Sequence, residues 1–256
     1  MASYLVTGSS RGIGLALAAT LASQPASEVA KVFAAARSAS EGLKKVISEL
    51  GGDRIEYVEL EVTSVESIQR AVAQVSVSLG GTAGLDVLIN NAANIGSHED
   101  RDVLDMDDLD EVYKVNVGGV HNVTRAFLPL LRKANQKRIM NISSSLGSIG
   151  WMPYFKPPAV LALPAYRISK TALNMLTVHY AEALRSEGFT VIAVSPGHVK
   201  THLDSADLTT EESVKALLEI LERLEPAQTG RFFNVRVPGW EDKEVSKRYD
   251  GQSPPW

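Results

Sequence analysis

A tyrosine and a lysine four residues apart are the side chains with the clearest chemical use. Pro164 favours the start of a helix that we expect to run from about Ala165 to Ser186, so Tyr166 and Lys170 share one face of it. A phenol with a pKa of about 10 is a poor acid or base at neutral pH unless a cation stabilises its phenolate. Lys170 is placed to do this, which predicts proton transfer at Tyr166. The alternative is an ordinary amphipathic surface pair.

Hydroxyl and amide groups offer partners for this pair. Ser143, Ser144 and Ser145 follow a predicted strand, where one hydroxyl could hydrogen-bond to a substrate carbonyl, although serines also form ordinary turns there. Asn116 lies on an otherwise apolar helical face, so its carboxamide needs hydrogen-bond partners. It is either a structural core amide or the holder of an active-site water.

Three glycines near the start of the chain predict a phosphate-binding turn. They separate a short apolar strand, Tyr4–Val6, from an apolar helical pattern that begins at Ile13. Glycines allow backbone angles that side chains forbid, and they let a phosphate approach the N–H groups at the start of a helix. A turn that serves packing alone is the alternative. The turn reads Thr7-Gly8-Ser9-Ser10-Arg11-Gly12-Ile13-Gly14.

Two arginines indicate which dinucleotide such a turn would accept. An acidic residue after the second strand of a nucleotide-binding fold bonds to a free ribose hydroxyl, but this sequence has Arg37 there. A guanidinium suits a 2′-phosphate instead, and Arg11 in the glycine turn could supply a second cation. Together they favour NADP(H) over NAD(H); the alternative is two solvated surface arginines.

Strand and helix patterns alternate along the whole chain, which predicts an α/β fold with a doubly wound parallel sheet in a single domain, residues 1–256. Such sheets bind ligands beyond the carboxyl ends of their strands. The remaining strands are expected at Lys31–Ala36, Val58–Val62, Leu85–Ile89, Arg138–Ile142, Thr190–Val194 and Arg231–Val237, and the remaining helices at Leu43–Leu50, Val65–Leu79, Asp107–Leu131 and Glu211–Leu224.

Composition excludes several classes of protein. The 256 residues are 45% hydrophobic and carry a net charge of -4, which gives no electrostatic signature for nucleic acid or an anionic membrane surface. Cysteine is absent, which removes disulfides and thiol chemistry. His198 and His202 lie four residues apart without a third ligand nearby, so we expect no metal site. Without a signal peptide or an apolar membrane-spanning stretch, a cytoplasmic protein is expected.

These motifs, taken in order, resemble the short-chain dehydrogenase/reductase family across nearly the whole chain. The glycine turn is similar to that family's cofactor loop, and Asn90-Asn91-Ala92-Ala93 resembles its Asn-Asn-Ala-Gly motif. Three stretches resemble the carbonyl-reductase-like branch that includes the sniffer and C-factor proteins: Ala165 to Asn174, Leu208 to Val214 and the ending Tyr249 to Trp256. Similar chains are frequent among fungal reductases of secondary metabolism.

The resemblance implies an NADPH-dependent carbonyl reductase that works as a homodimer or homotetramer. Tyr166 would protonate the carbonyl oxygen, Lys170 would also hold the nicotinamide ribose, and Asn116 would anchor a water. Ser144 matches the catalytic serine by its spacing to Gly147, with Ser143 as the alternative. The implied cofactor-binding residues are Gly8, Ser10, Arg11, Gly12, Ile13, Gly14, Arg37, Glu61, Val62, Asn90, Ala92, Tyr166, Lys170, Pro196, Gly197, Val199 and Thr201.

Two departures from the family pattern concern the substrate. Residues 148–164 are longer than usual and rich in proline and aromatic side chains, which indicates a pocket wall for a hydrophobic or ring-shaped substrate, or else a packed loop. Residues 200–210 form a second expected substrate loop, and residues 238–256 a C-terminal extension. Two other functions stay open: an NADPH-binding protein without redox turnover, and a partner-binding protein that uses exposed Trp151, Trp240 and Trp256.

Overall fold

One parallel sheet forms the centre of the molecule. The computed structural model describes residues 1–51, 53–96, 103–155, 163–201 and 206–256. In these ranges, seven strands pair in the order β3-β2-β1-β4-β5-β6-β7, and every pair is parallel. The strands are β1 (Ala2–Thr7), β2 (Val29–Ala36), β3 (Ile55–Glu59), β4 (Val87–Asn90), β5 (Arg138–Ile142), β6 (Thr190–Ser195) and β7 (Phe232–Asn234).

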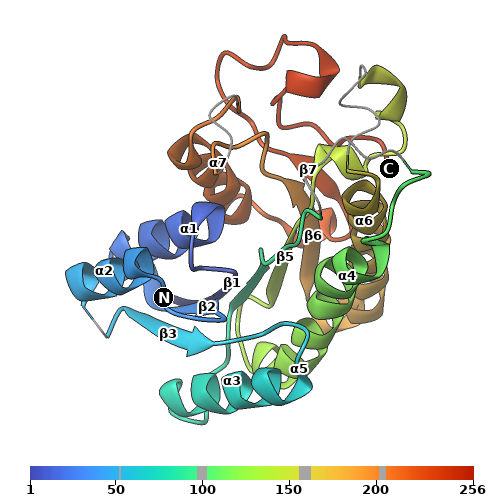
Figure 1. Ribbon diagram of the computed structural model, residues 1–256. Coiled ribbons are helices and arrows are strands. Elements are labelled where there is room, and N and C mark those ends of the chain that lie inside the picture. Colours follow the sequence, from blue (N-terminus) through green and yellow to red (C-terminus); the bar gives the residue numbers. More distant parts are fainter. Residues whose placement is uncertain (52, 97–102, 156–162, 202–205) are drawn as a thin grey trace.

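Helices cover both faces of this sheet (Figure 1). One layer consists of α1 (Gly12–Ser23), α2 (Glu41–Leu50) and α7 (Thr210–Glu222), and the other of α3 (Val65–Ser78), α4 (Leu109–Tyr113), α5 (Val120–Arg132) and α6 (Pro164–Leu184). A separate apolar core fills the space between the sheet and each layer. Because both faces are covered, β6 is buried along its whole length. The predicted doubly wound α/β fold is confirmed.

The chain order reverses between β1 and β4, which lie side by side at the middle of the sheet. From β1 the chain continues outward to β2 and β3, and from β4 it continues outward to β5, β6 and β7. The loops that leave the carboxyl ends of β1 and β4 therefore diverge, and a crevice opens between them. The residues of the predicted site must meet at this crevice.

The sequence prediction of the third strand was wrong in position. The strand covers Ile55–Glu59 rather than Val58–Val62, because its neighbour β2 ends at Ala36, which pairs with Glu59. Residues beyond Glu59 have no strand to pair with, so Glu61 and Val62 lie past the carboxyl end of the sheet. The apolar alternation of residues 58–62 reflects burial of Leu60 and Val62 rather than strand pairing.

The long helix predicted at Asp107–Leu131 is interrupted. A π-helical turn, Lys114–Gly119, separates α4 from α5. Gly119 packs so closely on Val62 that a Cβ there would lie 2.8 Å from the valine Cγ2. The turn also contains Asn116, which is fully buried. Wide turns of this kind often mark functional sites.

A capping box begins α7 and offers a test of local stability. The Thr209 Oγ1 accepts a hydrogen bond from the Glu212 N–H, and the Glu212 carboxylate accepts one from the Thr209 N–H. We expect Thr209→Ala to lower the free energy of unfolding by about 1 kcal/mol, measured by urea denaturation. Lys215→Ala on the exposed face of α7 is the matched control, and equal stability of the two variants would contradict the prediction.

Candidate active site

The glycine turn after β1 requires glycine at all three positions. Gly8 and Gly12 have φ values of +72° and +56°, which side chains strongly disfavour. A Cβ on Gly14 would lie 2.3 Å from the Gly8 carbonyl oxygen, so α1 begins directly against the turn. The N–H groups at the start of α1 are thereby presented beside bare backbone, as anion binding needs.

Two residues that the sequence analysis did not assign to the site hold this turn in place. The Thr7 Oγ1 accepts hydrogen bonds from the backbone N–H groups of Asn91 at 2.9 Å and Ala92 at 3.0 Å. The Asn91 Nδ2 donates to the Thr7 carbonyl oxygen at 2.9 Å. The turn after β1 and the loop after β4 are therefore one unit. In the sequence, the pairs Thr7-Gly8 and Asn90-Asn91 were the features that could have indicated this role of Thr7 and Asn91.

The predicted adenosine-side residues surround the carboxyl ends of β2, β3 and β4. Arg37 follows β2, is exposed, and its Nε lies 3.8 Å from the Glu61 Oε2. An exposed pair of this kind is worth little, so Arg37 can turn to an anionic ligand at low cost. The other Glu61 oxygen accepts from the backbone and hydroxyl of Thr63. Arg11 lies exposed at the N-cap of α1.

Asn90 performs a structural task inside the sheet. Its Nδ2 donates to the Thr124 Oγ1 at 3.1 Å and to the Asn141 Oδ1 at 2.9 Å, and only 2% of the residue is exposed. The Asn141 Nδ2 in turn donates to the Thr177 Oγ1. This buried chain of hydrogen bonds joins α5, β4, β5 and α6, so it fixes α6 relative to the carboxyl ends of the central strands.

The predicted catalytic side chains meet at the end of β5. The Ser144 side chain lies beside the Tyr166 hydroxyl, near enough to act on the pKa of that phenol. Lys170 is buried and its Nζ donates to the Ile142 carbonyl oxygen at 2.7 Å, while lying 5.4 Å from the centre of the Tyr166 ring. Ser143 points the other way, because its Oγ is buried against the Asn174 Oδ1 at 2.6 Å. The structure thus brings Ser144, and not Ser143, to Tyr166.

Burial sets the proton affinities of both ionisable groups. It raises the pKa of Tyr166 to about 12, which the hydrogen bond from Ser144 only partly offsets. It lowers the pKa of Lys170 to about 7, since a charged ammonium is poorly solvated there. The sequence analysis expected Lys170 to stabilise the Tyr166 phenolate, whereas burial of the phenol acts in the opposite direction. Tyr166 is held as a neutral phenol.

Asn116 connects the loop after β4 to the catalytic helix. Its Nδ2 donates to the Asn94 carbonyl oxygen at 2.7 Å and to the Ser169 Oγ at 2.9 Å, and its Oδ1 accepts from the Asn94 N–H at 2.8 Å. Ser169 also donates to the Tyr166 carbonyl oxygen. With both N–H groups of the carboxamide used, any water that Asn116 anchors must donate to it. Asn94 and Ser169 were not predicted as site residues.

The segment Pro196–Thr201 leaves β6 and reaches the glycine turn. The Ser213 Oγ of α7 donates to the Pro196 carbonyl oxygen at 2.7 Å, and Gly197 has a φ of +84°. At its far end, the Thr201 Cγ2 lies 3.1 Å from the position that a Cβ on Gly12 would take. The segment therefore closes one side of the crevice next to the turn.

Residues 156–162 and 202–205, within the two predicted substrate loops, lie outside the described residues, as does His202. Nearer residues of the first loop are packed: Phe155 is buried, and the Arg167 guanidinium lies 4.9 Å from its ring centre. Of the three tryptophans that the partner-binding alternative uses, Trp256 is 47% exposed, whereas Trp151 and Trp240 are partly buried. Trp240 packs on Tyr249 and Trp256 stacks on Phe232, with ring centres 5.5 Å and 5.6 Å apart.

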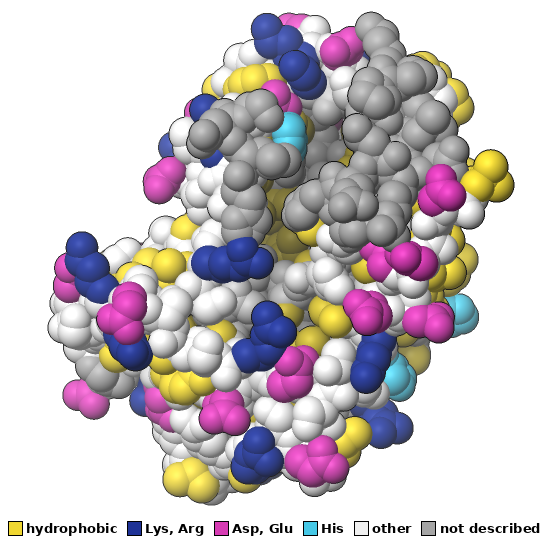
Figure 2. All heavy atoms as spheres, in the orientation of Figure 1, with side chains coloured by type: hydrophobic (Ala, Val, Ile, Leu, Met, Phe, Trp, Pro, Cys, Tyr) yellow, Lys and Arg dark blue, Asp and Glu magenta, His cyan; other side chains and the backbone are white. Residues whose placement is uncertain are grey.

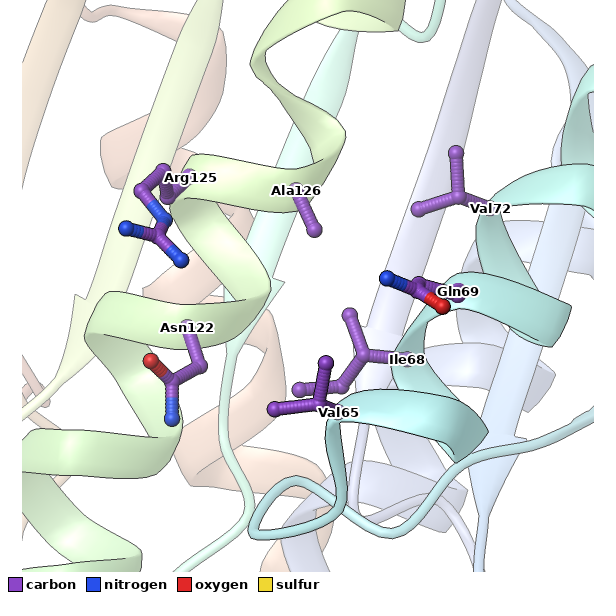
Figure 3. Close-up of a pocket in the computed structure, with 7 residues that line it drawn as sticks. All are labelled: Val65, Ile68, Gln69, Val72, Asn122, Arg125 and Ala126. Carbon is purple, nitrogen blue, oxygen red and sulfur yellow. The ribbon is translucent and has the colours of Figure 1, made fainter.

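The surface view shows a hollow with hydrophobic side chains on its floor, near the β5 label of Figure 1, and lysine or arginine side chains on one side of it (Figure 2). A separate pocket of about 330 Å³ lies between α3 and α5, and none of the predicted site residues lines it (Figure 3). Within the described ranges, no three His, Cys, Asp or Glu side chains gather as a metal site requires. No described helix is long and apolar enough to cross a membrane.

Comparison with known proteins decides the family. The sequence pattern described as short chain dehydrogenase matches residues 3–212. The chain belongs to the short-chain dehydrogenase family. The short-chain dehydrogenase anuI of Penicillium roqueforti is 34% identical over 203 residues, which cover 77% of this chain and 79% of that one.

Two solved structures place this short-chain dehydrogenase in the carbonyl-reductase-like branch, as the sequence predicts. An NADPH-bound carbonyl reductase from chicken fatty liver is 32% identical, with a TM-score of 0.81 over 99% of this chain and 98% of that one. The carbonyl reductase Sniffer of D. melanogaster is 26% identical, with a TM-score of 0.82 over the whole of both chains. The protein is therefore an oxidoreductase by family.

The lowered pKa of Lys170 predicts how stability depends on pH. An unfolded lysine has a pKa of about 10.4, so between about pH 7 and pH 10 the unfolded chain binds a proton that the folded protein does not. The free energy of unfolding must then gain a contribution that rises with pH across this range. Urea denaturation of the ligand-free protein should show this rise relative to Lys170→Met. Lys215→Met is the control, and an unchanged pH dependence in Lys170→Met would contradict the prediction.

Proposed function

We propose that the protein is an NADPH-dependent reductase of ketones or aldehydes on hydrophobic small molecules, including intermediates of secondary metabolism. The observation that carries this proposal is the meeting of Ser144, Tyr166 and Lys170 at the end of β5, two strands from the glycine turn of β1. A nucleotide-binding turn and a protonated phenol at one edge of a sheet are the two parts that carbonyl reduction needs.

The crevice fits a nicotinamide dinucleotide, because the glycine turn leaves bare backbone beside the start of α1. When bound, NADPH supplies the hydride that reduces the carbonyl carbon. The residues proposed to hold it are Gly8, Ser10, Arg11, Gly12, Ile13 and Gly14 at the phosphates, Arg37, Glu61, Val62, Asn90 and Ala92 at the adenosine half, and Tyr166, Lys170, Pro196, Gly197, Val199 and Thr201 at the nicotinamide half.

Tyr166 donates the proton that the reduced oxygen requires. Its raised pKa keeps the phenol protonated at physiological pH, and the alkoxide that develops during reduction is a stronger base than a phenolate. The Ser144 hydroxyl, which lies beside the Tyr166 hydroxyl, turns its proton to the same oxygen when the substrate binds and stabilises its charge. Both side chains are in place before the substrate binds, so only their hydroxyl protons reorient.

The proposed preference for NADPH rests on Arg37 and Arg11. Arg37 is the first residue after β2, and its weak exposed contact with Glu61 leaves the guanidinium able to bind a 2′-phosphate. The chicken carbonyl reductase, solved with NADPH, supports this choice. The predicted homodimer or homotetramer and the cytoplasmic location stay predictions.

Tyr166→Phe tests the catalytic assignment. Loss of the hydroxyl removes the proton donor and should lower turnover by at least about 100-fold, while NADPH affinity changes less than about twofold. The measurements are NADPH oxidation with a panel of ketones and aldehydes and a separate fluorescence titration with NADPH. Tyr180→Phe, on the same helix with its hydroxyl on His121, is the control. If the unchanged protein binds NADPH and reduces no carbonyl, the alternative without redox turnover is favoured.

Arg37→Ala tests the cofactor preference. A hydrogen bond to a charged group contributes about 1.5–3 kcal/mol, so the Kd for NADPH should rise by at least about tenfold, with the Kd for NADH nearly unchanged. Arg70→Ala is the matched control, because Arg70 is also exposed and forms a similar surface pair, 3.6 Å from Glu59. Equal losses for NADPH and NADH would refute the 2′-phosphate assignment and leave the reductase proposal standing.

A further inference from the structure

The C-terminal extension contacts the segment Pro196–Thr201, which the proposed function places at the nicotinamide. We propose that Tyr249, within this extension, is a positioning residue for cofactor binding, because its hydroxyl holds that segment against the glycine turn before NADPH binds. This inference rests on the proposed function. It makes the affinity of the protein for NADPH depend on Tyr249, which is far from the catalytic motif in the sequence.

The Tyr249 hydroxyl joins two residues of the connection between β6 and α7: His198, soon after β6, and Asp207, shortly before α7. It accepts a hydrogen bond from the His198 N–H at 3.2 Å and donates one to the Asp207 Oδ2 at 2.7 Å. The backbone completes the same junction, since the N–H groups of Asp207 and Leu208 both donate to the His198 carbonyl oxygen at 3.0 Å. One phenol therefore fixes both sides of this junction.

The ring of Tyr249 is itself held firmly. Only 3% of the residue is exposed, and the ring packs on Trp240. Its backbone is fixed as well, because the Val237 N–H donates to its carbonyl oxygen at 3.0 Å and its own N–H donates to the Trp240 carbonyl oxygen at 3.2 Å. Because the ring cannot move, its hydroxyl holds His198 and Asp207 in fixed positions.

The charge around the hydroxyl favours the same arrangement. The Asp207 side chain is 8% exposed, and its charged partners among the described residues are more distant: the His198 Nδ1 at 3.8 Å and the Lys247 Nζ at 3.9 Å. A buried carboxylate needs donors at hydrogen-bond distance. Burial, together with the hydrogen bond to Asp207, raises the pKa of Tyr249, so the phenol remains a donor at physiological pH.

The held segment ends at the proposed cofactor site. Gly197, next to His198, takes a φ of +84°, and a Cβ on it would lie 3.4 Å from the Tyr249 Cε1. From there the segment runs to Thr201, which closes on Gly12. Without the phenol hydroxyl, the segment would occupy its binding conformation for a smaller fraction of the time, and the apparent affinity for NADPH falls by that fraction.

The other end of the extension supplies a matched control. The Ser148 Oγ donates to the Pro255 carbonyl oxygen, and the Gly150 N–H donates to the Trp256 carbonyl oxygen at 3.0 Å. Ser148→Ala therefore loosens the extension from the loop before α6 without touching Tyr249. It should leave NADPH affinity within about twofold of the unchanged protein.

Fluorescence titration with NADPH tests the proposal in Tyr249→Phe. Loss of hydrogen bonds worth about 0.7–1.4 kcal/mol should raise the Kd by about three- to tenfold. The kcat at saturating NADPH should change less than about twofold, since the catalytic groups are not altered. Asp207→Ala should have the same effect, and it serves as the test if Tyr249→Phe does not fold. Asp207→Asn keeps an acceptor for the phenol and should restore most of the affinity.

Three results would overturn the proposal. Wild-type NADPH affinity in Tyr249→Phe would show that the hydroxyl positions nothing that the cofactor contacts. Equal weakening by Tyr249→Phe and Ser148→Ala would show that the effect is a general loosening of the extension. A folded, unchanged protein that binds neither NADPH nor NADH would overturn the proposed function as well, which distinguishes that failure from the first two.

Discussion

Buried hydrogen bonds between β5 and α6 set the geometry on which the site depends. Asn141 bonds to Thr177, Ser143 bonds to Asn174, and Lys170 bonds to the Ile142 carbonyl oxygen. Three contacts along consecutive turns of one helix leave it no freedom to slide or rotate on the strand. Because unpaired polar groups are costly in a core, this register is strongly preferred over others. Ser144 and Tyr166 meet as a consequence.

The same burial shapes the chemistry. The core that fixes α6 also removes water from Lys170 and from the Tyr166 hydroxyl, which lowers the first pKa and raises the second. A neutral, oriented phenol suits the donation of a proton to a developing alkoxide. The contribution of Lys170 to the free energy of unfolding therefore depends on pH. The same buried amine belongs to the candidate site and affects the stability of the fold.

The crevice is assembled from parts that are distant in the chain. The glycine turn is held by Thr7 and Asn91, the catalytic helix by Asn116 through Asn94 and Ser169, and the segment Pro196–Thr201 by Ser213 and Tyr249. In each case, a side chain that takes no part in the reaction bonds to the backbone or to a side chain of the element that it holds. The loops are thereby ordered by groups that the parallel sheet brings to one edge.

Local patterns in the sequence determined the α/β fold, the glycine turn and the Tyr166–Lys170 face, since each depends on backbone preference or on helical spacing over a few residues. The family resemblance also chose Ser144. Only the tertiary structure decided the rest. The end of β3 follows from where its partner β2 stops, the raised pKa of Tyr166 follows from how deeply α6 is packed, and the junction at Tyr249 joins residues that lie 42 and 51 positions apart. Burial and long-range pairing are properties of the assembled chain, and no short stretch of sequence contains them.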